Sequence, residues 1–187
     1  MFLQAREYLS THGYLDIAMD HFAKEDDELA VAYKNKVLHR NFMGYTVQEP
    51  RESIGFGLSS ISYIDHTFIQ NEKNLNEYYQ CIENYDYPIK SSKELDANDR
   101  ERQWIINTLM CTLELKTSEF ERIFKKPFMG FYKSEIDRLR ELAKEGFLEI
   151  NEEGIFITLK GRLFMRNICS VFDTYYQQKK QKFSKAI

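Results

Sequence analysis

Two glycine-containing segments that could bind a ligand lie close together in this 187-residue chain. They are RNFMGYT, which begins at Arg40, and GFGLSSIS, which begins at Gly55. The second segment has the first two glycines of a dinucleotide-binding fingerprint but lacks the third, so it is a weak nucleotide motif. Gly55 and Gly57 either let the backbone approach a ligand closely or form a tight bend between strands. From these residues alone we favour the bend.

The segment MDHFAKEDDE gathers acids around a histidine, a composition that could suggest a metal site or an acid–base pair. The acids Asp26, Asp27 and Glu28 are better explained as the start of a helix, where the macrodipole favours negative charge. Asp20 and His21 are then left at the end of a strand, the usual place for active-site residues in α/β architectures. His21 is therefore a candidate for a polar contact to a ligand and a poor candidate for a metal ligand.

Three cysteines, Cys81, Cys111 and Cys169, are odd in number and widely spaced. This pattern fits buried, reduced thiols better than disulfides, a zinc site or an iron-sulfur site. We therefore expect no metal site in this chain.

The composition indicates a folded globular protein. Apolar residues make up 43% and charged residues 29% of the chain, and the formal net charge is -3. An acidic balance supplies no electrostatic attraction for nucleic acid or anionic lipid. No apolar run approaches the roughly 20 residues needed to span a bilayer, and the first residues do not form a leader pattern. We expect a cytoplasmic protein with neither nucleic acid nor a membrane as partner.

Hydrophobic spacing predicts the elements that position the candidate residues. A first helix ends at Gly13, a short strand follows in YLDIAMD, and a second helix begins around Asp27. From Val37 to about Asn71 the glycines, Pro50 and β-branched residues predict short strands joined by ordered loops. Because the pattern changes there, we place a domain boundary near Asn71.

Beyond Asn71 the pattern is mostly helical. The predicted elements are a helix carrying Leu75 and Ile82, a loop in NYDYPIKSSKELDAND, a long helix from about Asp96, a helix EFERIF behind a capping box of Ser118 and Glu121, a helix capped by Ser134 and ended by Gly146, strands FLEI and IFIT, and a final helix from about Lys160 to Lys180. Helices followed by a hairpin are the order of a winged-helix unit. Acidic residues interleave with its basic ones, which disfavours binding in a DNA groove.

Four longer segments together resemble one known family. MDHFAKEDDELAVA, LHRNFMGYT, GFGLSSIS and KGRLFMRNICSVFDTYYQQK are similar to the C-terminal part of oxygen-independent coproporphyrinogen III oxidases, radical S-adenosylmethionine enzymes of haem biosynthesis. The resemblance covers essentially the whole chain. It implies an α+β, mostly helical fold. Residues 1–71 would be the terminal piece of a partial (β/α) barrel, and residues 72–187 a helical lid domain with a winged-helix-like hairpin.

The resemblance also implies an activity. Members of the family convert coproporphyrinogen III to protoporphyrinogen IX by oxidative decarboxylation of two propionates to vinyl groups. They use S-adenosylmethionine and a four-iron four-sulfur cluster, and the barrel that precedes the lid carries the catalysis. The implied partners of this chain are therefore the substrate coproporphyrinogen III and an N-terminal barrel.

Four residues are implied to line the S-adenosylmethionine site. Ile61 contributes to binding, and Gly55, Gly57 and Met43 lie in the same site, where small residues let the backbone approach the adenosyl group.

Two further residues are expected to contact the substrate. Arg40 is expected to bind a propionate or a cofactor carboxylate, because a guanidinium can hold a carboxylate with two hydrogen bonds. An ordinary structural ion pair explains Arg40 equally well. His21 is the second expected substrate contact.

Two departures from the family pattern matter. The family often has glutamine where this chain has Met43, which puts a polar contact to S-adenosylmethionine or the substrate in doubt. The cluster motif C-x3-C-x2-C is absent, and none of the three cysteines has its spacing. We therefore expect a fragment without catalytic residues of its own, inactive alone. The alternative is a stand-alone winged-helix-like module that binds a protein or a haem-related ligand without catalysis.

Overall fold

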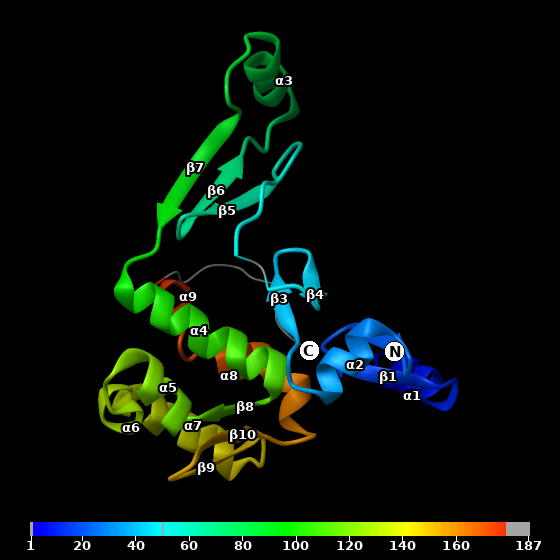
Figure 1. The fold of residues 1–187 in the computed structure, drawn as a ribbon, viewed down its shortest axis with the longest axis vertical. Helices are drawn as coiled ribbons and strands as arrows, with labels where there is room; N and C mark the ends of the chain where they lie inside the picture. Colours follow the sequence, from blue (N-terminus) through cyan, green and yellow to red (C-terminus); the bar gives the residue numbers. More distant parts are fainter. Residues whose placement is uncertain (1, 50, 179–187) are drawn as a thin grey trace. The chain divides into compact units, whose positions relative to one another are not determined.

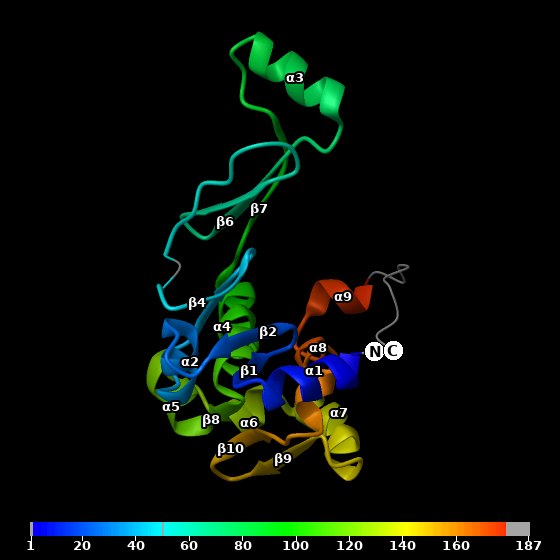
Figure 2. The same ribbon diagram turned by 90° about the vertical axis from the view of Figure 1, so that its right-hand side faces the viewer.

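The computed structural model describes residues 2–49 and 51–178, which form a mixed helix and sheet fold (Figures 1 and 2). The described residues group into two compact units. Of these residues, 2–38 and 102–178 belong to the first unit, and 39–49 and 51–101 form the second. Each unit is described separately below.

The first unit begins with two helices around a β-hairpin. Its elements are α1 (Phe2–Thr11), β1 (Tyr14–Ala18), β2 (His21–Lys24) and α2 (Glu28–Lys34). Gly13, at φ +77°, follows α1, and the Asp27 side chain accepts a hydrogen bond from Leu29 N at 2.8 Å, so both predicted helix boundaries are confirmed. β1 and β2 are antiparallel, and His21 pairs with Ala18. The prediction that His21 lies at a strand end after β1 was therefore wrong: His21 opens the returning strand β2, because the chain turns tightly at residues 19–20.

The rest of the first unit packs helices against a three-stranded sheet. Helix α4 (Ala97–Thr112) enters this unit at Arg102. The elements that follow it are β8 (Glu114–Lys116), α5 (Thr117–Phe124), α6 (Phe128–Phe131), α7 (Lys133–Lys144), β9 (Leu148–Asn151), β10 (Gly154–Ile157), the 3-10 helix η1 (Gly161–Phe164), α8 (Met165–Cys169) and α9 (Thr174–Gln178). The sheet order is β8-β10-β9, with antiparallel neighbours. Its core contains the fully buried Ile105, Leu109, Phe120, Phe128, Tyr132, Leu139, Ile155 and Phe172. The predicted long helix and hairpin are confirmed.

Two contacts join the distant segments of the first unit. Arg162 Nη2 donates to the backbone carbonyl of Asp16 at 2.7 Å. Lys36 Nζ forms an ion pair with Glu114 Oε2 at 2.6 Å. The N-terminal hairpin and the C-terminal helices therefore form one folded body.

The two serine caps predicted in this unit were wrong. α5 begins at Thr117, one residue before Ser118, and Lys116 precedes it without a side-chain cap. α7 begins at Lys133, and Ser134 Oγ donates to the Glu135 carboxylate at 2.7 Å rather than capping the backbone. At α5, the Thr117 hydroxyl fixes the start of the helix by donating to the carbonyl of Glu152 at 3.1 Å. At α7, the helix starts where α6 ends, because α6 leads directly into it.

The predicted continuous final helix was also wrong. Between residues 160 and 178 the chain forms η1, α8 and α9, with a break after Cys169. The break turns Val171 and Phe172 into the core, where 4% and 0% of their surfaces remain exposed. Asp173 then accepts hydrogen bonds from the backbone of Tyr175 and Tyr176, both at 2.9 Å, and starts α9. The last two predicted helical positions lie outside the described residues.

The second unit contains two small antiparallel sheets and one helix. Its elements are β3 (His39–Asn41), β4 (Gly44–Thr46), β5 (Ile61–Ile64), β6 (Thr67–Asn71), α3 (Leu75–Glu83) and β7 (Ile89–Glu94). β3 pairs with β4, and the second sheet has the order β5-β6-β7, with α3 beyond its end (Figure 1). The short strands predicted before Asn71 and the helix predicted after it are confirmed.

Strand β7 replaces the predicted loop. All six of its residues are exposed, so no buried face marks it as a strand in the sequence. It is defined by its pairing with β6, and Lys90 and Lys93 add ion pairs to Glu72 and Asp99. Because this pairing joins chain on both sides of Asn71, the observed grouping differs from the predicted division into residues 1–71 and 72–187. Asn71 lies inside the second unit.

Two of the three cysteines are buried as predicted. Cys111 and Cys169 lie in the core of the first unit, whereas Cys81 on α3 is partly exposed. Within residues 2–49 and 51–178, no group of three or more histidine, cysteine or acidic side chains is arranged to hold a metal ion. No helix in the same ranges is long and apolar enough to cross a bilayer.

Candidate functional site

The glycine segment forms an ordered loop that leads into β5. Gly55 N donates to Ser62 Oγ at 3.0 Å. A side-chain carbon added at Gly55 would lie 2.7 Å from the carbonyl oxygen of Ile61, so only glycine allows this close approach of two backbone segments. Gly55 and Ile61, predicted to share a site, are therefore in contact. The structure therefore shows the predicted bend, and the approach of a ligand to these glycines stays a prediction.

Asn71 holds the other half of this loop. Its Nδ2 donates to the carbonyl of Gly57 at 3.0 Å and to Ser60 Oγ at 2.9 Å. Ser60 Oγ itself donates to the Gly57 carbonyl at 2.8 Å. Gly57 has φ +98° with no atom within 4 Å of an added side-chain carbon, so glycine is required there for its backbone angle and not for space. The loop is a fixed surface, because side chains hold both of its ends.

The RNFMGYT segment forms the β3–β4 hairpin of the same unit. Asn41 Oδ1 accepts a hydrogen bond from Met43 N at 2.8 Å, which shapes the turn. The Met43 side chain is 93% exposed at the tip. Phe42 contacts Phe68 of β6 edge to face, with ring centroids 5.1 Å apart. This contact places the hairpin against the same sheet that carries Ile61.

Arg40 has an unusual environment for an arginine. Its guanidinium lies 5.5 Å from the centroid of the Tyr45 ring. Its Nε is buried and, within the described part of the chain, has no hydrogen-bond partner. A buried donor without a partner carries a free-energy cost of about 1–3 kcal/mol, which an incoming acceptor would remove. Among the described residues, Arg40 Nε is therefore a buried donor without an acceptor.

The predicted site residues do not all belong to one unit. Arg40, Met43, Gly55, Gly57 and Ile61 lie in the second unit. His21 lies in the first, where its Nδ1 is 3.0 Å from Asp20 Oδ1.

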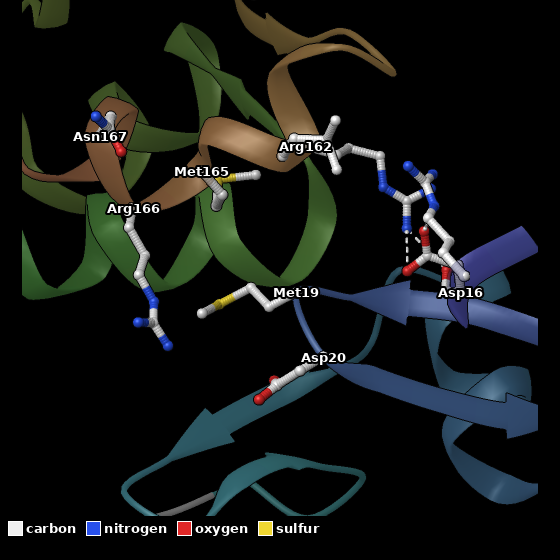
Figure 3. A pocket seen from close by; sticks show the side chains of 9 residues that line it. Asp16, Met19, Asp20, Arg162, Met165, Arg166 and Asn167 are labelled. Atoms are coloured by element: carbon white, nitrogen blue, oxygen red, sulfur yellow. Dashed lines mark hydrogen bonds and ion pairs between the residues drawn. The ribbon is translucent and has the colours of Figure 1, made fainter. Parts of the chain in front are cut away.

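A pocket of about 210 Å³ lies beside Asp20, within the first unit (Figure 3). It is lined by Arg6, Asp16, Met19, Asp20, Arg162, Leu163, Met165, Arg166 and Asn167. One wall comes from α1, β1 and the β1–β2 turn, and the other from η1 and α8. Sequence reasoning missed this pocket, although Arg162 and Arg166 are spaced four apart in the segment KGRLFMRN.

Two of the pocket's three arginines are held by Asp16. Arg6 Nε lies 2.7 Å from Asp16 Oδ2, and Arg162 Nη2 lies 3.3 Å from Asp16 Oδ1. Arg162 also donates to the carbonyl of Ile17 at 3.2 Å. These contacts fix one end of the pocket and leave the end near Arg166 open (Figure 3).

The two sites offer different chemistry. The loop of the second unit presents backbone groups, and the β3–β4 hairpin of the same unit carries a buried arginine donor. The pocket of the first unit presents charge and thioethers. Neither contains an activated nucleophile or a metal-binding cluster within the described ranges.

The family comparison identifies what the chain resembles. Residues 95–164 match the HemN C-terminal domain family. The oxygen-independent coproporphyrinogen III oxidase of Escherichia coli (strain K12) is 41% identical over 182 residues, which are 96% of this chain and 40% of the relative. The oxidase of Thermostichus vulcanus is 42% identical over 183 residues, which are 97% of this chain and 56% of the relative.

A solved structure shares the fold. The coproporphyrinogen III oxidase (HemN) from Escherichia coli, a radical SAM enzyme, matches with a TM-score of 0.88 and 40% identity, over 93% of this chain and 40% of that chain. The resemblance expected from the sequence is therefore confirmed. The chain spans about two fifths of the E. coli relative. Nothing in these comparisons favours the stand-alone binding module.

Proposed function

We propose that this chain, which is similar over nearly its whole length to oxygen-independent coproporphyrinogen III oxidases, is the C-terminal part of such an enzyme. The observation that carries the proposal is the 41% identity over 96% of the chain. The sequence match over that length spans both units, so it is not limited to one short motif. The enzyme would convert coproporphyrinogen III to protoporphyrinogen IX by oxidative decarboxylation of two propionates.

The described residues do not fit the iron-sulfur cluster. No three potential ligands come together among them, and the three cysteines lie on separate elements. We propose that the part of the enzyme that this chain does not match supplies the cluster ligands. The 187 residues would then be inactive alone.

The loop from Gly55 to Ser62 is proposed as one edge of the S-adenosylmethionine site. The open side of Gly57 supports this, because no atom lies within 4 Å of the position of its absent side chain, whereas Gly55 packs against the backbone of Ile61 and so holds Ile61 in place. These residues would hold the adenosyl part of S-adenosylmethionine, whose one-electron reductive cleavage by the cluster would release methionine and supply the deoxyadenosyl radical that abstracts a hydrogen atom from the propionate. Gly57 keeps the loop bent, and Met43 would add an apolar contact from the hairpin.

Arg40 is proposed to hold a carboxylate of the substrate or of S-adenosylmethionine. Its buried, unpartnered Nε favours this role over an ordinary ion pair. His21 is proposed as a second polar contact to the substrate, and its hydrogen bond with Asp20 would orient the ring.

We further propose a role for each part of the chain. Residues 1–71 would include the barrel edge, and residues 72–187 would form the winged-helix-like lid over the substrate. The three-stranded sheet with α4, α5 and α7 is compatible with the lid. We also propose that the enzyme acts in the cytoplasm and binds neither nucleic acid nor a membrane.

A chimera tests the proposed function in cells. The matching C-terminal part of the E. coli oxidase is replaced by this chain, and the chimera is expressed in a strain that depends on that enzyme for anaerobic haem synthesis. We expect growth without added haem, and loss of growth when Ile61 is changed to Asp, because a charge would face the cofactor. A stable chimera that binds S-adenosylmethionine but never restores growth would contradict the proposal.

A further inference from the structure

We propose that the pocket of the first unit binds a carboxylate carried on a short apolar arm, with Arg166 holding the carboxylate. This pocket is separate from the proposed S-adenosylmethionine edge, whose residues belong to the other unit. The inference deepens the proposed function and rests on it in one respect: the arm would be a propionate of coproporphyrinogen.

The charges of the pocket favour an anion. Three guanidinium groups line it against two carboxylates. Asp16 is occupied by Arg6 and Arg162, at 2.7 and 3.3 Å. Asp20, the second carboxylate, is 74% exposed in its side chain, and it hydrogen-bonds the ring of His21 at 3.0 Å. The three guanidinium groups and two carboxylates together leave a net charge of one positive unit in the pocket.

Arg166 carries that charge. It lies on α8 and is exposed, and its side chain forms no hydrogen bond or ion pair with another residue in the ranges 2–49 and 51–178. Figure 3 shows it extending from α8 toward the β1–β2 turn, into the same open space as Met19 and Asp20. A guanidinium in this position can hold a carboxylate with two parallel hydrogen bonds.

Two methionines supply the apolar surface next to Arg166. Met165 on α8 is 3% exposed, and Met19 enters the pocket from the β1–β2 turn (Figure 3). Met19 has φ +53°, a backbone angle that glycine or asparagine usually occupies. Flexible thioethers adapt to the shape of a methylene chain.

The pocket is large enough for one side chain of a ligand but too small for a whole drug-sized ligand. Its volume is about 210 Å³. Sites that enclose an entire drug-sized molecule have roughly 300–1,000 Å³. A tetrapyrrole is too large for this pocket, whereas one of its propionate side chains fits.

The first test uses the 187-residue chain with methionine methyl groups labelled for NMR, titrated with butanoate. We expect the Met19 and Met165 methyl signals to shift, and the change Arg166→Gln to weaken butanoate binding about ten-fold. Methyl butanoate, which has no charge, should bind weakly and equally to both proteins. Arg140→Gln is the matched control, because Arg140 pairs with Asp137 on the surface of α7. Unmoved methionine signals, or equal butanoate affinity after Arg166→Gln, would overturn the carboxylate site.

The second test separates the pocket from the proposed function. We assign to the pocket one of the two propionates that keep their carboxyl groups. In the E. coli chimera, Arg166→Gln should then raise KM for coproporphyrinogen about ten-fold and leave kcat nearly unchanged, because the lost contact does not involve a propionate that reacts. An unchanged KM, with butanoate binding still dependent on Arg166, would overturn the assignment of the arm to the substrate. A wild-type chimera without turnover would overturn the proposed function, while the butanoate result would still decide the pocket.

Discussion

At the scale of single residues, glycines mark the places where two backbone segments touch. Gly161 is buried where η1 begins, and an added side-chain carbon would overlap the carbonyl of Phe147. Thr158 N donates to the same carbonyl at 3.1 Å, so the backbone there cannot move without loss of a hydrogen bond. The contact therefore fixes the connection from β10 to the pocket-forming helices.

We expect Gly161→Ala to lower the free energy of unfolding by about 3 kcal/mol or more, because overpacking against backbone cannot be relieved by a rotamer change. Gly130→Ala is the control: the nearest atom to its added carbon is a side-chain atom of Pro127 at 3.9 Å. It should change stability by less than about 1 kcal/mol. Urea unfolding of both variants measures the difference, and equal stabilities would contradict the contact.

Glu135 is the buried acid of the first unit. Burial alone would raise the pKa of its carboxyl, but hydrogen bonds from Ser134 and Arg102 lower that pKa below the ordinary 4.5. Arg102 Nη2 lies 2.8 Å from Glu135 Oε1 and also donates through Nη1 to the carbonyl of Phe172 at 3.1 Å. The charged carboxylate therefore anchors the arginine that holds the C-terminal segment.

Glu135→Gln should consequently show a pH-dependent loss of stability. The folded-state pKa is depressed, so the stabilisation is present above pH 4.5 and is lost as the pH falls through the folded-state value. At pH 7 we expect a loss of about 1–3 kcal/mol in the free energy of unfolding, which shrinks as the pH is lowered below 4.5. Urea titrations across this range measure it, with Glu141→Gln, an exposed partner of Lys144, as the control. A loss that stays constant with pH would contradict the role of the charge.

At the scale of elements, the start of helix α2 is fixed by a side chain next to it in the sequence. Asp27 begins α2, as the acidic run predicts, by accepting from Leu29 N. Asp27→Ala should lower the free energy of unfolding by about 1 kcal/mol. Asp26→Ala removes the same charge one residue earlier without removing the cap and should have a smaller effect. Thermal unfolding of the two variants compares them, and an equal loss would indicate charge rather than capping.

Element types were predictable wherever apolar residues recur with a regular period. The helices ending at Gly13 and Gly146 and the β9–β10 hairpin follow from such spacing. β7 was missed because all of its side chains are exposed, so only its pairing with β6 makes it a strand. The final helix was predicted too long because apolar spacing records burial and not an unbroken backbone, and Val171 and Phe172 are buried at the break.

At the scale of the whole molecule, contacts between distant segments were the hardest to predict. The loop at Gly55 was visible in the sequence because its glycines and Ile61 are near neighbours. The pocket was not, since Arg162 and the Asp16 backbone that it holds are 146 positions apart. The same reason explains the unit boundaries: the first unit combines the two ends of the chain, and sequence order alone suggests a single cut near Asn71.

Anaerobic turnover by the purified E. coli chimera would show whether these residues form the C-terminal part of a coproporphyrinogen oxidase, as proposed. We expect the chimera to convert coproporphyrinogen III to protoporphyrinogen IX with two carboxyl groups lost as carbon dioxide, and we expect Ile61→Asp to abolish this conversion. A chimera that carries its iron-sulfur cluster and binds S-adenosylmethionine, yet leaves all four propionates intact, would contradict the proposed function.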